Sequence, residues 1–147
     1  MIDFLNETDD TAAEEVLTEL SKILRSITDK EMELIFVDDA QIQEINKTNR
    51  GMDKATDVLS FPIDFPGTPL IGTVVISLDT AKRAALELGH DYEAEIKLLF
   101  IHGLLHLLGY DHEVDNGEMR KKEEALIAEF GLPDSLIVRS EGDEESD

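Results

Sequence analysis

One stretch decides how this chain folds, and it reads His102-Gly-Leu-Leu-His106-Leu-Leu-Gly-Tyr-Asp-His112. Residues 98–108 are apolar nearly all round, which predicts a helix buried in the middle of a domain. His102 and His106 are four positions apart, so on that helix they share one face and can approach a single ion. Gly109 can adopt a positive φ and end the helix, which lets the chain turn and bring His112 toward the same point.

The spacing of these histidines predicts a metal site. Three imidazoles from a helix and the following turn leave a fourth tetrahedral position open for water, as in catalytic zinc centres. We expect one zinc ion per chain, held by His102, His106 and His112. Zinc suits neutral imidazoles in a chain without cysteine, although ligand type alone also allows nickel, cobalt or copper. The alternative is that these are ordinary core or surface histidines, which the spacing makes the weaker interpretation.

The same spacing occurs in the zinc-protease signature H-E-x-x-H-x-x-G-x-x-H. In this chain Gly103 stands where that signature has the glutamate that acts as general base. A peptidase mechanism would therefore lack its proton acceptor, although the metal scaffold is kept.

Composition narrows the class of protein. The 147 residues are most simply one domain, which we place at residues 1–139. The chain has 13 basic and 34 acidic residues, a formal net charge of −21, which opposes binding of a polyanion overall. Part of that charge lies in residues 140–147, which we expect to form an acidic disordered tail. The absence of cysteine, of a long apolar run and of a signal-peptide pattern predicts a cytoplasmic protein without a membrane segment.

Hydrophobic periodicity predicts a single α+β domain with about four strands and about five helices. We expect the strands to form one mixed sheet that packs with the helices. The expected strands are residues 2–5, 32–36, 58–61 and 73–76, because apolar and β-branched residues run or alternate there. The expected helices are residues 11–27, 38–49, 77–88, 91–108 and 115–130. Capping boxes at Thr11, Asp38 and Asp115 would begin three of them. His90 falls in a turn between two helices, and we expect it at the surface.

A basic segment interrupts the acidic chain between Lys47 and Lys54, which contains three bases and one acid. Arg50 lies inside it and can make forked hydrogen bonds to a phosphate. The alternative is that these are ordinary solvated bases at a helix end, where the helix dipole favours cations. The spacing alone favours neither interpretation.

Three motifs together carry a resemblance to a known family: Asn49-Arg-Gly51, Thr56-Asp-Val-Leu-Ser-Phe61 and the histidine stretch. The chain resembles the YbeY family of bacterial endoribonucleases and rRNA maturation factors from about residue 35 to residue 124. The resemblance implies a zinc-dependent hydrolase of single-stranded RNA, active in rRNA processing (notably at the 3′ end of 16S rRNA) and in ribosome quality control. It also implies that His102, His106 and His112 bind zinc and that Arg50 lies in the substrate channel.

One departure from the family pattern is visible, because the usual Gly-Asp of the second strand motif is Gly72-Thr73 here. Asp57 and Asp111 could orient the imidazole ligands, or they could serve as cap and turn residues. Two other functions stay open: a metal-dependent hydrolase of peptides or small molecules, and a non-enzymatic ribosome assembly factor. The acidic surface could dock basic ribosomal proteins, or it could simply be solvated.

Overall fold

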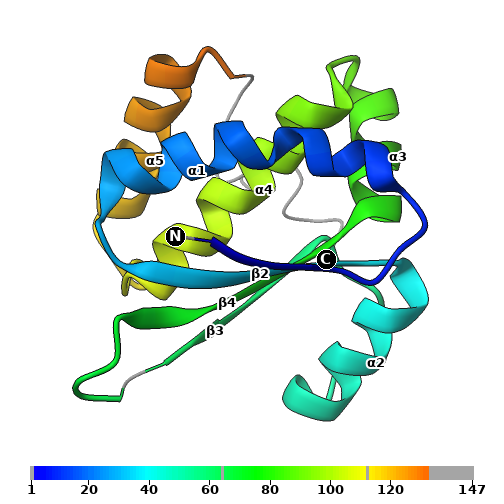
Figure 1. Cartoon of the computed structure of the whole chain (residues 1–147), viewed down its shortest axis with the longest axis horizontal. Helices are drawn as coiled ribbons and strands as arrows, with labels where there is room; N and C mark the ends of the chain where they lie inside the picture. The colour runs from blue at the N-terminus through cyan, green and yellow to red at the C-terminus, as the bar shows by residue number, and fades with distance from the viewer. Residues whose placement is uncertain (1, 64, 112, 133–147) are drawn as a thin grey trace.

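A four-stranded mixed sheet forms the middle of the fold (Figure 1). The computed structural model describes residues 2–63, 65–111 and 113–132. The strands run in the order β1-β2-β4-β3, in which β1, β2 and β4 are parallel and β3 is antiparallel to β4. Their bounds are β1 Ile2–Asn6, β2 Glu31–Val37, β3 Val58–Pro62 and β4 Leu70–Ser77. The predicted mixed sheet is confirmed, and β4 begins at Leu70 rather than Thr73.

The helices divide unequally between the two faces of this sheet (Figure 1). Four α-helices and a short 3-10 helix cover one face, and a single helix, α2, lies on the other. Their bounds are η1 Thr11–Val16, α1 Leu17–Ile27, α2 Asp39–Arg50, α3 Leu78–Leu88, α4 Tyr92–Leu107 and α5 Glu118–Phe130. The predicted α+β class, with five α-helices in the described part of the chain, is confirmed.

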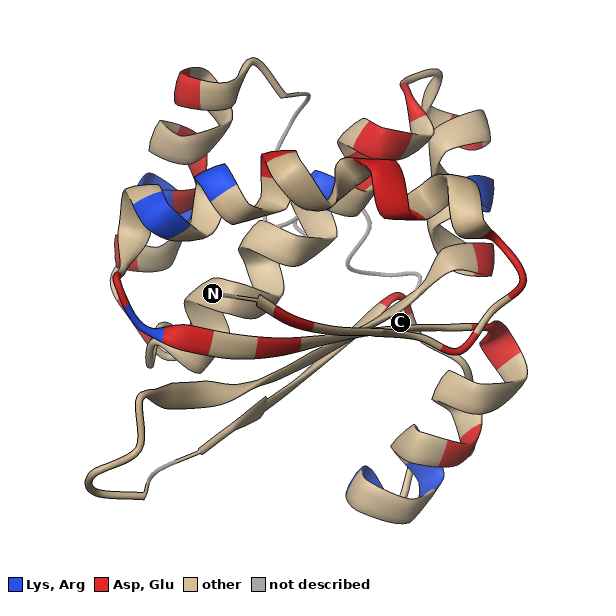
Figure 2. Cartoon of the chain, in the orientation of Figure 1, with Lys and Arg blue, Asp and Glu red and all other residues tan. Residues whose placement is uncertain are grey.

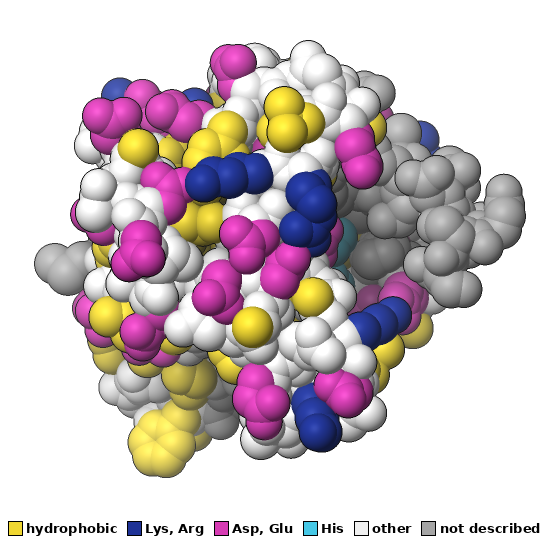
Figure 3. Space-filling view, turned by 90° about the vertical axis from the view of Figure 1, so that its right-hand side faces the viewer, with side chains coloured by type: hydrophobic (Ala, Val, Ile, Leu, Met, Phe, Trp, Pro, Cys, Tyr) yellow, Lys and Arg dark blue, Asp and Glu magenta, His cyan; other side chains and the backbone are white. Residues whose placement is uncertain are grey.

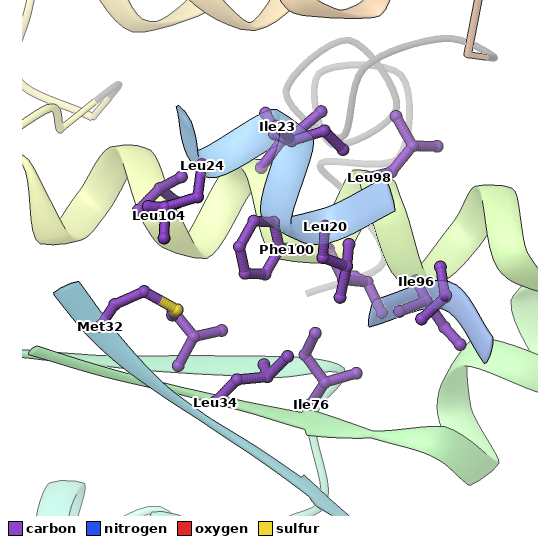
Figure 4. Close-up of a cluster of buried hydrophobic side chains, with 14 of the residues drawn as sticks. Leu20, Ile23, Leu24, Met32, Leu34, Ile76, Ile96, Leu98, Phe100 and Leu104 are labelled. Atoms are coloured by element: carbon purple, nitrogen blue, oxygen red, sulfur yellow. The ribbon is translucent and has the colours of Figure 1, made fainter. Parts of the chain in front are cut away.

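Helix α4 is the buried centre of the domain. Ten of its sixteen residues are buried, which confirms the helix predicted from the apolar stretch. Figure 4 shows Phe100 and Leu104 of α4 between α1 and the sheet, with Met32 of β2 below them. Gly109 has a φ of +98° just beyond the helix, as expected of the residue that ends it.

Gly103 allows α4 to approach the sheet closely. A Cβ atom at this position would lie 2.9 Å from Cγ1 of Val74 and 3.1 Å from Oγ of Ser60. The Ser60 hydroxyl donates a hydrogen bond to the Gly103 carbonyl at 3.0 Å, which ties α4 to strand β3. The side of α4 at residue 103 therefore faces the sheet and has no space for a larger side chain.

The capping predictions have mixed outcomes. The capping box at Asp38 is confirmed, because Asp38 and Gln41 exchange side-chain to backbone hydrogen bonds of 2.8 and 2.9 Å. The box at Thr11 is wrong. Asp10 caps the first turn by accepting a hydrogen bond from the Ala13 backbone at 3.2 Å, and that turn is 3-10 rather than α.

The last helix begins later than predicted. Helix α5 starts at Glu118 after Gly117, not at Asp115. The Asp115 carboxylate still accepts hydrogen bonds from the backbone of Gly117 and Met119, at 2.9 and 3.0 Å. Asp115 therefore supports the helix start from within the preceding turn, which the sequence pattern alone does not distinguish from a cap.

Asp39 joins the start of α2 to the start of α3. Its carboxylate accepts hydrogen bonds from the hydroxyls of Ser77 and Thr80, both at 2.7 Å, and pairs with Arg83 at 2.7 Å. Burial raises the pKa of Asp39, but the hydrogen bonds from these three partners outweigh burial and hold the pKa below its ordinary value. Because the folded pKa is the lower one, ionised Asp39 stabilises the fold above about pH 4, and this contribution disappears as pH falls further.

We therefore expect Asp39→Asn to lower the free energy of unfolding at pH 7 by about 1–3 kcal/mol. The difference from the wild type should shrink as the pH is lowered from 6 to 3, which urea denaturation at each pH measures. The exposed Asp3→Asn is the control and should leave stability nearly unchanged. A wild-type to Asp39→Asn difference that is constant with pH would contradict the assigned role of the charge.

Candidate active site

A cleft of about 580 Å³ opens where the C-terminal half of α4 meets the edge strand β3. Its described walls come from α4, from the turn after α4, from β3 and from the end of α2. The lining residues are Arg50, Asp57, Val58, Ser60, Pro62, His102, His106, Gly109, Tyr110, Asp111 and Glu113. Two parts of the chain that are far apart in the sequence therefore form one cleft: the end of α2 with β3, and α4 with the turn after it.

His102 and His106 lie next to each other in this cleft, as their helical spacing predicts. Their ring centroids are 4.8 Å apart and the ring planes are inclined by 77°. His112 lies outside the described residues, so its convergence with the other two stays a prediction. Among residues 2–63, 65–111 and 113–132, which leave out residue 112, no group of three histidine, cysteine or acidic residues could hold a metal ion.

Glu123 of α5 contacts the His102 ring, and the sequence analysis did not identify this residue. Its Oε2 lies 3.0 Å from Nδ1 of His102, and the Glu123 side chain is 1% exposed. Glu123 occupies a position between Met119 and Leu126 in the buried stripe of α5. A glutamate within an apolar stripe is the signal that could have identified it, because buried carboxylates need a partner.

The described contacts of Asp57 and Asp111 are those of cap and turn residues. Asp57 accepts a hydrogen bond from the backbone of Val58 at 2.8 Å, and Asp111 accepts one from Glu113 at 3.0 Å. Both aspartates line the cleft. Of the two interpretations left open by the sequence, these contacts favour the structural one.

Arg50 reaches the cleft from the opposite face of the sheet. It lies in the last turn of α2, which carries basic side chains near its end (Figure 2). Its Nη2 lies 3.4 Å from the Ser60 carbonyl of edge strand β3, so the guanidinium extends around that edge. Arg50 is exposed and lines the cleft. The structure therefore brings Arg50 into the same cleft as His102 and His106.

The packing of Gly103 explains why no glutamate stands at the protease-type position. Gly103 is not among the described residues that line the cleft, and a Cβ at this position would meet Val74 and Ser60. A glutamate there would place a carboxylate against the sheet, where it could not act on a substrate. Thr73, which stands where the family pattern has an aspartate, is not among the described residues that line the cleft. Its hydroxyl donates a hydrogen bond of 2.8 Å to Glu33 on the neighbouring strand.

The structure places His90 differently from the sequence-based prediction. Its side chain is only 14% exposed, and its Nε2 lies 2.6 Å from Oε1 of the buried Glu95 near the start of α4. The prediction of a surface histidine is therefore wrong, because the turn folds this side chain against α4. His90 is not among the described residues that line the cleft.

One opening of the fold holds two imidazoles and an arginine, a set of side chains that can take part in hydrolysis. The family model described as "Endoribonuclease YbeY" matches residues 2–131. The chain belongs to the YbeY endoribonuclease family, which confirms the resemblance seen in its motifs.

Individual relatives agree with this assignment. An endoribonuclease YbeY of Nautilia profundicola is 58% identical and covers 96% of this chain and 99% of its own length. A Wolinella succinogenes relative of the same name is 51% identical with the same coverage of each chain. The solution structure of a Thermotoga maritima protein superposes with a TM-score of 0.63 at 32% identity, covering 86% of this chain and 87% of that one. None of the helices in the described residues is long and apolar enough to cross a membrane.

Proposed function

We propose that this protein is a zinc-dependent endoribonuclease that cuts single-stranded RNA during rRNA maturation, including the 3′ end of 16S rRNA, and in ribosome quality control. The observation that carries the proposal is the pair of α4 imidazoles beside Arg50 in one cleft. Membership in the YbeY family supports the reaction type. A role on ribosomal RNA also implies a cytoplasmic location and contact with the ribosome.

The residues present fit a zinc ion. His102 and His106 offer neutral nitrogen ligands from one rigid, buried helix, and His112 would complete the set. The carboxylate of Glu123 contacts the far ring nitrogen of His102, an arrangement typical of histidine ligands of metals. When bound, zinc would supply a Lewis acid that polarises a phosphoryl oxygen and makes water more acidic.

The charge of the cleft supports the need for a cation. The carboxylates of Asp57, Asp111 and Glu113 share the cleft with Arg50. One positive group against three negative ones gives the described lining residues a formal charge of −2. A phosphodiester would be repelled from such a cleft, and a divalent ion would offset that charge. Figure 3 shows acidic side chains spread among a few basic ones over one face of the molecule, and the formal net charge of −21 opposes general attraction of RNA.

Arg50 would hold the scissile phosphate. Its guanidinium presents several donors at the mouth of the cleft, next to the two imidazoles. Those donors would stabilise negative charge as it develops on the phosphoryl oxygens in the transition state. Its hydrogen bond to the Ser60 carbonyl limits the orientations of the side chain before the substrate arrives.

We expect Arg50→Ala to reduce RNA cleavage by about 10²- to 10³-fold, because an electrostatic contact of this kind acts mainly in the transition state. The zinc content should stay that of the wild type. The assay is cleavage of a labelled single-stranded RNA by metal-quantified protein. Lys47→Ala is the matched control, since Lys47 is an exposed base in the same last turn of α2. Full cleavage by Arg50→Ala would remove Arg50 from the mechanism.

Assays on peptides and on ribosome assembly, run beside the RNA assay, separate the two other functions. Activity on peptides but not on RNA would indicate a peptidase, which the packing of Gly103 against the sheet disfavours. A ribosome assembly factor without catalysis would bind zinc and cleave nothing. Its effects on assembly would survive in Arg50→Ala.

A further inference from the structure

The buried carboxylate of Glu123 on α5 contacts the His102 ring, one of the two α4 imidazoles in the cleft. Glu123 is 1% exposed, and its Oε2 lies 3.0 Å from Nδ1 of His102. Nothing in the proposed reaction requires this carboxylate, because Glu123 is not among the described residues that line the cleft. An ionisable side chain is almost never buried to this degree unless a partner compensates its charge.

The contact has a chemical consequence for the imidazole. An ionised carboxylate can only accept a hydrogen bond, so with Glu123 ionised the 3.0 Å contact places a proton on Nδ1 of His102. In the neutral ring the lone pair is then on Nε2, which is the atom that remains to bind a cation. Without the carboxylate, the neutral ring could carry its proton on either Nδ1 or Nε2. The Nε2–H tautomer would present an N–H, not a lone pair, to the metal.

We infer that Glu123 is a positioning residue that sets the Nδ1–H tautomer and the ring orientation of His102, and that α5 is therefore part of the zinc site. The inference rests on the proposed zinc dependence and extends it to a residue outside the cleft. Because outer-shell partners of this kind typically change metal affinity by 10- to 100-fold, we expect an effect of about that size when Glu123 loses its oxygen atoms.

The chain contains its own control for this inference. His90 and Glu95 form a second histidine–carboxylate contact with the same exposure of the two side chains, 14% and 1%. Glu95 is buried on α4, as Glu123 is on α5, but its partner His90 does not line the cleft. Removing either carboxylate disturbs a comparable buried pair, and only one of the two pairs belongs to the metal site.

The first measurement is the tautomer of His102 in the metal-free wild type at pH 8, from long-range ¹H–¹⁵N NMR correlations of the histidine rings. We expect the proton on Nδ1. A His102 ring with its proton on Nε2 would overturn the inference. This readout depends on neither zinc nor RNA cleavage, so it is independent of the proposed function.

The second measurement is the zinc dissociation constant, from competition with a chelator, for the wild type, Glu123→Met and Glu95→Met. We expect Glu123→Met to weaken zinc binding about 10- to 100-fold and to change the His102 tautomer distribution. Glu123→Gln, which keeps an acceptor oxygen, should recover part of the affinity. Glu95→Met should leave zinc affinity at the wild-type value.

The outcomes separate the two proposals. Equal weakening by Glu123→Met and Glu95→Met would show a general effect of core disruption and would overturn the positioning role. Wild-type zinc affinity in Glu123→Met would overturn it as well. If the wild type shows the Nδ1–H tautomer but binds no zinc, the proposed zinc dependence fails, and with it the part of the inference that assigns α5 to a zinc site.

Discussion

His106→Ala is expected to abolish zinc binding and RNA cleavage together. His106 lies one helical turn from His102, with ring centroids 4.8 Å apart, so its removal leaves α4 with a single imidazole in the cleft. A zinc site with three protein ligands would then keep two, and catalytic activity of this kind depends on the complete set. We expect zinc content near zero after dialysis and cleavage at the background rate of the RNA.

The experiment compares wild type and His106→Ala, purified identically, by metal quantification and by cleavage of labelled single-stranded RNA. His90→Ala is the control, since His90 has a partner near the start of α4 and does not line the cleft. We expect it to retain zinc and cleavage. Equal cleavage by wild type and His106→Ala would identify a contaminating nuclease and contradict an intrinsic activity at this site.

Gly103→Glu is expected to prevent stable folding rather than to create a peptidase. A Cβ at residue 103 already meets Val74 at 2.9 Å, and the remaining atoms of a glutamate would extend further into the sheet. The change combines overpacking with a buried carboxylate, and a buried uncompensated charge alone costs about 3–5 kcal/mol. That amount is a large part of the total stability of a domain of this size.

Gly103→Ala tests the same contact at a smaller cost. We expect it to lower the free energy of unfolding by about 1–3 kcal/mol, the usual cost of adding a methyl group to a packed interface. The double variant with Val74→Ala should recover part of that loss, because the smaller side chain removes the closest atom. Urea denaturation of the two single variants and the double variant measures the coupling. The packing explanation would be contradicted by strictly additive effects.

Much of the fold follows from local pattern. The apolar run of residues 98–108 predicts the buried helix α4, because a helix that is apolar nearly all round has no face to present to water. The spacing of His102 and His106 places both rings on one side of that helix, since residues four apart are one turn apart. The capping box at Asp38 likewise depends only on residues within one turn.

Other features depend on segments that are far apart in the chain. The strand order β1-β2-β4-β3 follows from which strands pair, and apolar alternation along each strand does not determine that. The expected surface position of His90 was wrong because the buried Glu95 draws the ring against α4, a contact that the residue pattern of a turn does not contain.

The sequence by itself determined the class of the fold, the central helix and the shared face of its two histidines. Local hydrogen bonding and the period of apolar residues set these features, so neighbouring residues are enough to predict them. Only the tertiary structure decided that Arg50 reaches the histidines around the edge of β3, that Gly103 is required by contact with Val74, and that Glu123 stands behind His102. These are contacts between side chains brought together by packing of the sheet against its helices, and no spacing within one segment encodes them.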